Sequence, residues 1–346
     1  MTMKKTALAV AALASTAAFA QSNVTIYGIA DVGFSHRGDN RTAGVGSRNS
    51  VDSGQQSDTR LGFKGTENLG DGLSAVFTLE TGIAADNGGF TLSGLAFGRQ
   101  SFAGLSSTTL GTLLAGRQYS PQFTLLSATD PFAVGTVGKA NNIYNVTSRY
   151  NNLVKYVSPN FGGFGITAGY TNSGLQNESA VQATTEDRKV WMISPVYSNG
   201  PLMVGVNFHQ EKGAASNAKT KVWDLAASYD LKVAKLAAAY GTQAISTANS
   251  GWAASDAKSY LLGATVPVGV AGNVLVSYSQ RKADFNNQKA SQWALGYTHD
   301  LSKRTNLYAV YADISNKNGA TADTGDNANT GLGYQNGFQL GLRHKF

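Results

Sequence analysis

Apolar and polar residues alternate along the end of the chain, with the two-residue period of a strand that has one apolar and one polar face. The apolar set is Phe338, Leu340, Leu342 and Phe346, and the polar set is Gln339, Gly341, Arg343 and Lys345. One face suits hydrocarbon and the other suits water. An alternating strand that ends on a terminal aromatic residue is typical of an outer-membrane β-barrel.

The same alternation recurs in many other segments of the chain. Clear apolar sets are Leu202, Val204, Val206 and Phe208; Trp223, Leu225, Ala227 and Tyr229; Trp293, Leu295 and Tyr297; and Phe164, Ile166, Ala168 and Tyr170. A period of two is the strand signal, and this many repeats exceed what a single hairpin shows. The chain is therefore predicted to be all-β.

Two kinds of connection alternate between these segments. The seven short ones lie at residues 68–71, 106–108, 159–162, 199–200, 231–232, 267–271 and 301–303. The eight long ones lie at 37–56, 85–94, 119–147, 173–185, 213–218, 246–254, 284–288 and 315–334. This count predicts about sixteen antiparallel strands with both chain ends on the short-turn side, and a barrel of that size encloses an aqueous bore.

A soluble β-sandwich also alternates, but its strands usually have only about 5 to 6 residues. From Phe338 to Phe346 the strand covers about 26 Å, which leaves about 19 Å of height at a tilt near 45°. This height approaches the ~25 Å apolar band of an outer-membrane barrel. We therefore predict a transmembrane antiparallel β-barrel.

The start of the chain has the organisation of an export signal. Lys4 and Lys5 precede an apolar stretch, and small residues end it at Ala18 and Ala20. As a membrane anchor, this stretch of about 15 residues is shorter than the ~20 of a spanning helix. We predict that residues 1–20 are a signal peptide removed after Ala20, and that residues 21–346 form one barrel domain in the cell outer membrane.

Composition limits the chemistry of the chain. There is no cysteine, which excludes disulfides and thiol catalysis, and 40 glycines against 6 prolines suit long strands. The formal charge of +7 becomes 7 − 2 = +5 without Lys4 and Lys5. Nucleic acid is not expected as a partner, because no basic run of five or more residues occurs. Two explanations of the positive net charge remain. One is a basic channel lining that favours small anions, and the other is an ordinary excess of solvated basic residues.

The longest connection, at 119–147, contains unusually many apolar residues for a surface loop. They are Phe123, Leu125, Leu126, Phe132, Val134 and Val137. An exposed loop of this kind leaves much apolar area in water, so we expect it to fold against the inner wall and narrow the pore. The alternative is an outward-facing interaction loop.

Alternation also orients charged residues on the predicted strands. Those expected on the lumen face are Arg60, Lys64, Glu80, Arg99, Arg149 and Lys155. Arg99 and Arg149 are expected to face the lumen because Phe102 and Tyr150 are expected to face outward. The reverse orientation would place arginine against lipid, at about 2 to 4 kcal/mol each near the midplane.

Arginines that face a narrow passage give a potential that attracts small anions, and their charge persists at any working pH. Glu80 and Asp130 are expected to balance part of this field. Each of these charges could instead lie in the lumen far from the constriction, so the set carries more weight than any single member.

No enzymatic motif is present. The chain lacks G-x-S-x-G and P-loop sequences, and its four histidines show no metal-ligand spacing. We therefore predict no catalytic residue, no metal and no cofactor. A barrel hydrolase with a Ser–His pair on the outer wall needs no local motif and stays as an alternative.

Several segments are similar to those of a known family. They are Ser22 to Gly28 with Asp31, Ser57 to Gly70, Leu79–Glu80, Gly98 to Gln100, Ala103 to Leu105, Ala115 to Tyr119, Ser158 to Phe164, Leu301 to Thr305 and Gly341 to Phe346. In these segments the chain resembles the Gram-negative general porins of the beta-proteobacterial type, and the resemblance covers the whole length.

This resemblance implies a homotrimer of sixteen-stranded barrels, each with its third external loop folded into the pore, in contact with outer-membrane lipid and lipopolysaccharide. It implies an anion-favouring arginine cluster at Arg60, Arg99 and Arg149 with Glu80 beside them, and places Arg117 next to this cluster at the start of the loop. The terminal Phe346 resembles the signal read by the barrel-assembly machinery.

The function predicted is an outer-membrane diffusion channel for small hydrophilic solutes and ions, with a preference for anions. One alternative is a substrate-specific channel for organic anions with a saturable site at the arginines. Another is a surface adhesin or immune-contact barrel whose loops matter more than its bore.

Overall fold

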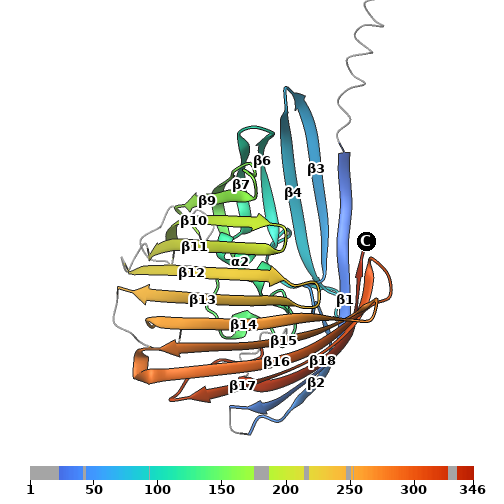
Figure 1. Cartoon of the computed structure of the whole chain (residues 1–346), viewed down its shortest axis with the longest axis vertical. Coiled ribbons are helices and arrows are strands. Elements are labelled where there is room, and N and C mark those ends of the chain that lie inside the picture. Colours follow the sequence, from blue (N-terminus) through green and yellow to red (C-terminus); the bar gives the residue numbers. More distant parts are fainter. Residues whose placement is uncertain are drawn as a thin grey trace, which may run out of the picture.

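The computed structural model describes residues 23–41, 44–92, 94–174, 187–213, 218–246, 251, 253–325 and 333–346. The predicted signal peptide and its cleavage site after Ala20 lie outside these residues. Figure 1 shows long strands wound into one curved sheet, and the C-terminus lies beside the first strand.

The described chain is almost entirely sheet. Its strands are β1 (Asn23–Asn40), β2 (Arg48–Ser53), β3 (Arg60–Gly70), β4 (Leu73–Ala84), β5 (Gly89–Phe90), β6 (Gln100–Ser107), β7 (Gly111–Tyr119), β8 (Arg149–Val157), β9 (Phe164–Thr171), β10 (Arg188–Asn199), β11 (Leu202–Gly213), β12 (Lys219–Asp230), β13 (Lys235–Ile245), β14 (Ala257–Val268), β15 (Gly272–Ala283), β16 (Gln288–Asp300), β17 (Thr305–Lys317) and β18 (Tyr334–Lys345). Its helices are α2 (Pro121–Thr129) and the 3₁₀ turns η1 (Ala140–Asn142) and η2 (Phe285–Asn287).

The sheet closes through the first strand. Along one edge β1 pairs antiparallel with β18, and along the other it pairs first with β3 and then with β2. Because β2 and β3 share one position and β5 is only a two-residue strand in the loop after β4, eighteen elements form 18 − 2 = 16 barrel positions. The predicted closed barrel of sixteen strands is confirmed.

The connections keep the predicted order, but several boundaries differ. The connection predicted at 85–94 is too short, because β6 begins only at Gln100. The loop predicted at 37–56 is too long, because β1 continues to Asn40 and β2 occupies Arg48–Ser53. At this end of the barrel both faces of the strand carry polar residues, so apolar alternation stops before the hydrogen-bonded ladder does. The pattern of hydrophobicity therefore marks the apolar part of a strand rather than its full length.

The two faces of the barrel strands differ as the alternation predicts. In β16 the outward Trp293 is 48% exposed, whereas the neighbouring Gln292 is 1% exposed. In β12 outward Trp223 and Leu225 alternate with buried Asp224 and Ala226. Large apolar side chains thus form the outer surface, and the inside is lined mostly by small or polar ones, with larger apolar side chains where the loop packs. None of the described helices is long and apolar enough to cross a membrane.

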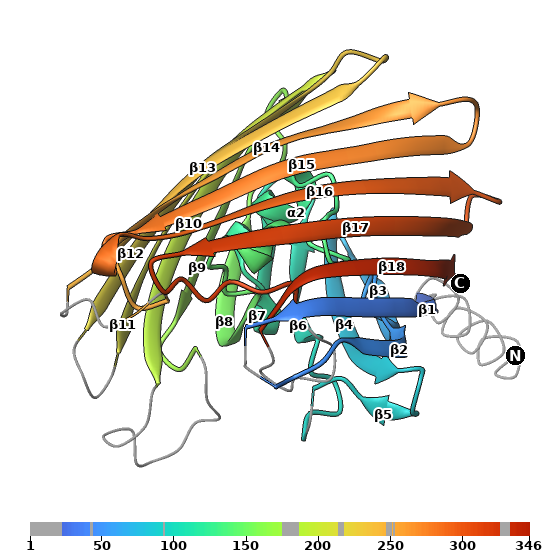
Figure 2. The ribbon, with the colours of Figure 1, turned by 90° about the horizontal axis from the view of Figure 1, so that it is seen from below.

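The segment between β7 and β8 contacts the inner wall. Its helix α2 begins at the cap Ser120, whose hydroxyl accepts the Phe123 N–H at 3.0 Å, and Pro121 occupies the first turn. In Figures 1 and 2 the helix lies within the curve of the sheet. It packs against β10, β11, β12 and β13.

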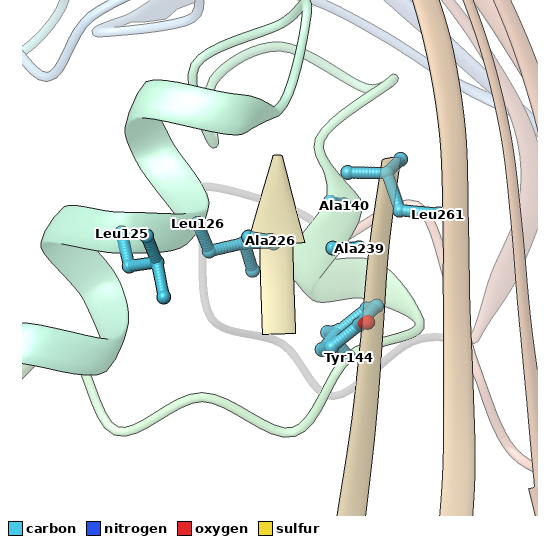
Figure 3. Close-up of a cluster of buried hydrophobic side chains, with 7 residues drawn as sticks. All are labelled: Leu125, Leu126, Ala140, Tyr144, Ala226, Ala239 and Leu261. Atoms are coloured by element: carbon cyan, nitrogen blue, oxygen red, sulfur yellow. The ribbon is translucent and has the colours of Figure 1, made fainter. Parts of the chain in front are cut away.

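An apolar cluster fixes this segment to the wall. Figure 3 shows Leu125 and Leu126 of α2 with Ala140 and Tyr144, facing Ala226, Ala239 and Leu261 of the strands. The wall residues are small where the loop approaches most closely. A Cβ added at Gly205 would lie 2.4 Å from a Leu125 methyl carbon, and one at Gly263 would lie 2.4 Å from the Pro131 ring. Glycine at these two strand positions leaves the room that the loop occupies.

Hydrogen bonds to lumen-facing side chains add to this packing. Gln122 donates to Asp224 at 3.1 Å, the Val137 N–H donates to Gln339 at 2.8 Å, and Asn142 donates to Gln292 at 2.8 Å. These contacts are spread over strands β12, β16 and β18. The loop is therefore attached at both ends and along its middle.

Candidate pore constriction

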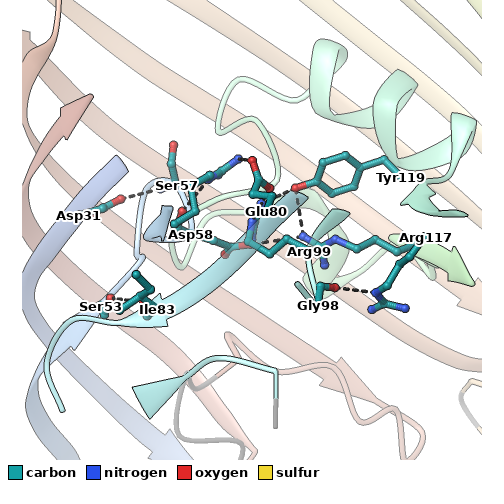
Figure 4. Close-up of polar contacts among 12 residues, drawn as sticks. Asp31, Ser53, Ser57, Asp58, Glu80, Ile83, Gly98, Arg99, Arg117 and Tyr119 are labelled. Carbon is teal, nitrogen blue, oxygen red and sulfur yellow. Dashed lines mark hydrogen bonds and ion pairs between the residues drawn. The ribbon is translucent and has the colours of Figure 1, made fainter. Parts of the chain in front are cut away.

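Opposite α2, three arginines and two carboxylates meet on the inner side of the barrel. Arg60 lies at the start of β3, Glu80 in β4, Arg99 just before β6 and Arg149 at the start of β8, and Asp58 lies in the bend between β2 and β3. Figure 4 shows Asp58, Glu80 and Arg99 of this cluster with Tyr119 beside them. Residues from three strands, one bend and the position before β6 thus form one site.

Glu80 is the buried centre of the cluster, with 2% of its surface exposed. One oxygen accepts the Arg99 Nε–H at 2.8 Å, and the other accepts the Tyr27 hydroxyl at 3.0 Å. The Arg60 guanidinium lies 3.9 Å from the same carboxylate. A charge-assisted pair of this kind holds the guanidinium in one orientation.

A glycine makes room for part of this network. Gly62 is paired with Glu80 across the β3–β4 ladder, and a Cβ at Gly62 would lie 2.3 Å from the Tyr27 ring. Without a side chain at Gly62, the ring crosses β3 and reaches Glu80. The hydrogen bond between Tyr27 and Glu80 therefore depends on this glycine.

Asp58 is placed by a buried carboxylate on a different strand. Asp31 of β1 accepts the Ser57 N–H at 2.6 Å and the Tyr308 hydroxyl at 2.6 Å. The Asp31 carbonyl also accepts the Gly54 N–H at 2.7 Å. Asp31 thus fixes both ends of the bend, and the bend directs Asp58 to the guanidinium of Arg99, with which it forms an ion pair.

Tyr119, the last residue of β7, organises two of the arginines. Its hydroxyl receives hydrogen bonds from Arg99 and from Arg149, the latter at 3.0 Å. The Arg149 guanidinium lies 4.6 Å from the centre of the ring, and Phe123 of α2 stacks on that ring at 4.8 Å. Tyr119 therefore connects the arginines to the loop.

The cluster carries a positive charge. Three arginines against Asp58 and Glu80 give 3 − 2 = +1. The carboxylates also keep the guanidinium groups apart in fixed positions, which reduces their mutual repulsion. A fixed positive charge on the wall of a narrow aqueous passage attracts anions and repels cations.

The other predicted site residues lie elsewhere. Lys64 is on the inner face, where its ammonium group lies 5.3 Å from the centre of the Tyr27 ring. Arg117 donates to the Gly98 carbonyl and to Asn151, both at 2.5 Å, and so turns away from the carboxylates. Lys64 therefore flanks the cluster, and Arg117 lies behind it.

Asp130 does not reach the arginines. It is buried within the loop, where its carboxylate accepts N–H groups from Phe132, Val134 and Ala140 at 3.1, 3.0 and 2.9 Å. Burial raises the pKa of Asp130 to about 6, although these three hydrogen bonds act in the opposite direction. Its role is to hold the turn after α2, because a side chain this short cannot satisfy that turn and also reach the lumen.

Phe346 completes the closure of the barrel. Its backbone exchanges two hydrogen bonds of 3.1 Å with Gly28 of β1. A Cβ added at Gly28 would lie 2.3 Å from the Phe346 ring, so glycine leaves room for this ring. The terminal aromatic residue is thus part of the seam between the first and last strands.

Arg99 and Arg149 were predicted to face the lumen because Phe102 and Tyr150 were expected to face outward. This reason is wrong, although both arginines reach the cluster. The ladder pairs Phe102 with Thr78 and Gly116, on the face of Glu80, so Phe102 points inward. Tyr150 is buried and donates to Glu211, also on the inner face. The alternation is broken because Arg99 precedes the first residue of β6.

The second break lies in β8. There the register with β7 shifts by one residue at Asn152, which has a φ of 51°. Arg149 therefore reaches Tyr119 from beyond a bulge. In both cases a local backbone irregularity, and not simple alternation, directs the arginine.

Sequence reasoning missed two members of the cluster, Asp58 and Tyr119. Both stand inside segments that carry the family resemblance, and Asp58 is the only carboxylate in the bend at residues 54–59. No periodicity marks them, since one lies in a bend and the other at a strand end. A search for acidic and aromatic residues in those segments could have found them.

Two cavities adjoin at the cluster. One of about 640 Å³ lies between the loop after β4 and the bend that carries Asp58. The other, of about 420 Å³, lies between that bend and α2. Asp58 and Arg99 line both cavities. Within the described part of the chain, no group of three or more His, Asp or Glu residues could hold a metal ion.

Known proteins share this architecture. A family model described as Gram-negative porin matches residues 7–319. An outer membrane porin protein of Bordetella pertussis and outer membrane porin protein 32 of Delftia acidovorans are each 34% identical to this chain, over 99% of it and 100% of the relative. The solved structure of an anion-selective porin from Comamonas acidovorans is 32% identical, covers 94% of this chain and 100% of its own, and superposes with a TM-score of 0.80.

Proposed function

The chain belongs to the Gram-negative porin family and is an outer-membrane channel, and we propose that its bore passes small hydrophilic solutes with a preference for anions. The channel is passive and has no enzymatic activity. Substrate movement then depends only on concentration, size and charge. The observation that carries the anion preference is the cluster of Arg60, Arg99 and Arg149, which exceeds its carboxylates by one charge.

The fixed geometry of these arginines supports this proposal. Arg99 is held by Glu80, Asp58 and Tyr119 together, so it cannot fold back onto the wall when an ion approaches. Arg60 and Arg149 contact the same carboxylates only at 3.9 and 3.7 Å. Arg60 also donates to the Asp58 carbonyl and Arg149 to the Tyr119 hydroxyl, and their other donors can bind a passing anion. The segment with α2 lies opposite and narrows the passage in this proposal.

A homotrimer is the assembly that the family resemblance supports, with Phe346 as the signal for barrel assembly. In the same proposal, residues 1–20 direct export and are removed. A channel specific for organic anions is the second candidate, because planar guanidinium groups suit carboxylates. No observation favours an adhesin.

Single-channel recording in planar bilayers tests the anion preference. The variant Arg60→Gln removes the arginine with the fewest close partners and should move the reversal potential in a KCl gradient toward cation preference, most clearly at low salt. The matched control is Arg304→Gln, which changes an exposed arginine in the turn after β16. A native reversal potential without anion preference, or equal values for Arg60→Gln and the native protein, would reject the proposal.

A further inference from the structure

A third cavity lies beyond the arginine cluster, on the other side of α2. It has a volume of about 320 Å³ and lies between α2 and the inner faces of β8, β9, β10 and β11. Tyr119, Thr124 and Ala128 line both this cavity and the one next to the arginines. The two cavities therefore adjoin along α2.

The lining of this cavity is mainly apolar. Leu125 of α2 faces Val157, Val196 and Met203, which lie on strands β8, β10 and β11. Leu125 is held by its contact with Gly205 and by the apolar cluster of the loop, so this part of the wall is packed on both sides. A packed apolar wall inside an aqueous bore offers a contact surface to the apolar part of a solute.

One cation projects into the apolar lining. Lys155 of β8 is half-buried, and its ammonium group donates to the Tyr119 carbonyl at 3.4 Å. None of the ion pairs formed among the described residues includes Lys155. An ammonium group has three donors, so at least two remain for a ligand. The arginines of the cluster, in contrast, all have carboxylates close to them.

Lys155 lies further along the channel than the arginines. It follows Arg149 by six residues on the same strand, toward the short-turn end and beyond the bulge at Asn152. Tyr119 connects the two positions, since its hydroxyl contacts Arg99 and Arg149 and its carbonyl contacts Lys155. The channel thus offers a second cationic position after the first, with a different surrounding.

We propose that this cavity is a subsite for organic monocarboxylates that carry an aromatic or branched apolar group. Their carboxylate pairs with Lys155, and their apolar group packs on Leu125, Val196 and Met203. The site favours such anions over chloride or acetate, because only they satisfy both the ammonium group and the apolar wall. This inference deepens the proposed anion channel and rests on it.

The test is the block of chloride current by added carboxylate in planar bilayers. Benzoate is the probe, and acetate is the comparison with the same charge and no apolar ring. In the native protein, benzoate at millimolar concentration should reduce the single-channel chloride conductance in a saturable way, and acetate should reduce it much less.

Two substitutions separate the two halves of the site. Lys155→Met keeps most of the length of the side chain without its charge and should weaken the benzoate block about tenfold. Met203→Gln keeps the shape but places an amide against the ring and should weaken it about fivefold. Lys303→Met, an exposed lysine in the turn after β16, is the matched control and should leave the block unchanged.

The outcomes distinguish this inference from the channel proposal. Equal block of the native protein by benzoate and acetate, or a benzoate block that survives Lys155→Met unchanged, overturns the subsite and leaves the anion preference standing. A native channel whose reversal potential shows no anion preference overturns the channel proposal itself. Loss of the benzoate block in Lys155→Met with retained anion preference supports both.

Discussion

Replacing Asp58 by Asn should make the channel more selective for anions. Asp58 is the carboxylate of the cluster with the most exposed side chain, at 57%, whereas that of Glu80 is 3% exposed. Arg99 keeps its hydrogen bond to Glu80 in this variant, so the arginines should stay in place. The charge of the cluster then rises from 3 − 2 = +1 to 3 − 1 = +2.

The size of the effect follows from Coulomb's law. An ion that passes about 6 Å from the lost charge, in a medium of dielectric constant near 80, gains or loses about 0.7 kcal/mol. Because anion and cation respond with opposite sign, the permeability ratio changes by about 1.4 kcal/mol before screening, which is about tenfold. Screening reduces this change in the permeability ratio to about fourfold at 0.1 M salt, where the Debye length is about 10 Å, and to about 1.4-fold at 1 M, where it is about 3 Å.

Reversal potentials in KCl gradients measure this ratio directly. The control is Asp71→Asn, an exposed residue in the turn between β3 and β4, where the positive φ of 50° also suits asparagine. An unchanged chloride-to-potassium ratio at 0.1 M would refute the electrostatic argument. A change that is equally large at 1 M would also refute it, because an unscreened effect points to an altered pore shape.

Two further variants test the supporting structure. Gly62→Ala places a Cβ 2.3 Å from the Tyr27 ring, so it should displace the hydrogen bond from Tyr27 to Glu80. Thermal denaturation should then show an unfolding free energy lower by about 1 to 3 kcal/mol. The control is Gly46→Ala, whose added Cβ has no atom within 4 Å, and equal stability of the two variants would contradict the argument. Asp130 has a pKa of about 6, above its usual value, so the folded protein binds this proton more tightly than the unfolded chain, and its contribution to stability is lost as pH rises through about 6. Asp130→Asn removes this pH dependence. The difference in unfolding free energy between the native protein and the variant should therefore shrink by at most about 3 kcal/mol between pH 4 and 7. Denaturation at several pH values measures this difference, and a constant difference would refute the raised pKa.

The barrel could be predicted from the sequence because its constraints are local. Each strand must present apolar residues to lipid and small or polar ones to water, so the period of two is written into every segment. Trp223 and Trp293 face outward, and Asp224 and Gln292 face inward, as their positions in the pattern indicate. The count of turns and loops then gives the strand number. The end of β1 and the position of β2 did not follow, because polar residues on both faces carry no period.

The cluster at the proposed constriction was only partly predictable. Arg60 and Glu80 lie on regular stretches of β3 and β4, where alternation decides their direction. Arg99 and Arg149 lie at strand ends beside irregular backbone, and the outward directions inferred for Phe102 and Tyr150 were wrong. Asp130 belongs to the same loop as the apolar residues that contact the wall, yet its carboxylate serves the backbone of that loop.

The sequence by itself therefore determined the class of fold, the number of barrel strands and the apolar outer surface, since each depends on neighbours along the chain. Only the tertiary structure decided which charges meet. Asp31 positions Asp58 through a bend, Tyr119 joins Arg99 to Arg149, and Lys155 lies in an apolar lining built from three other elements. These contacts join residues far apart in the chain, and their geometry depends on bulges, strand ends and close packing at glycine, which a period of two does not encode.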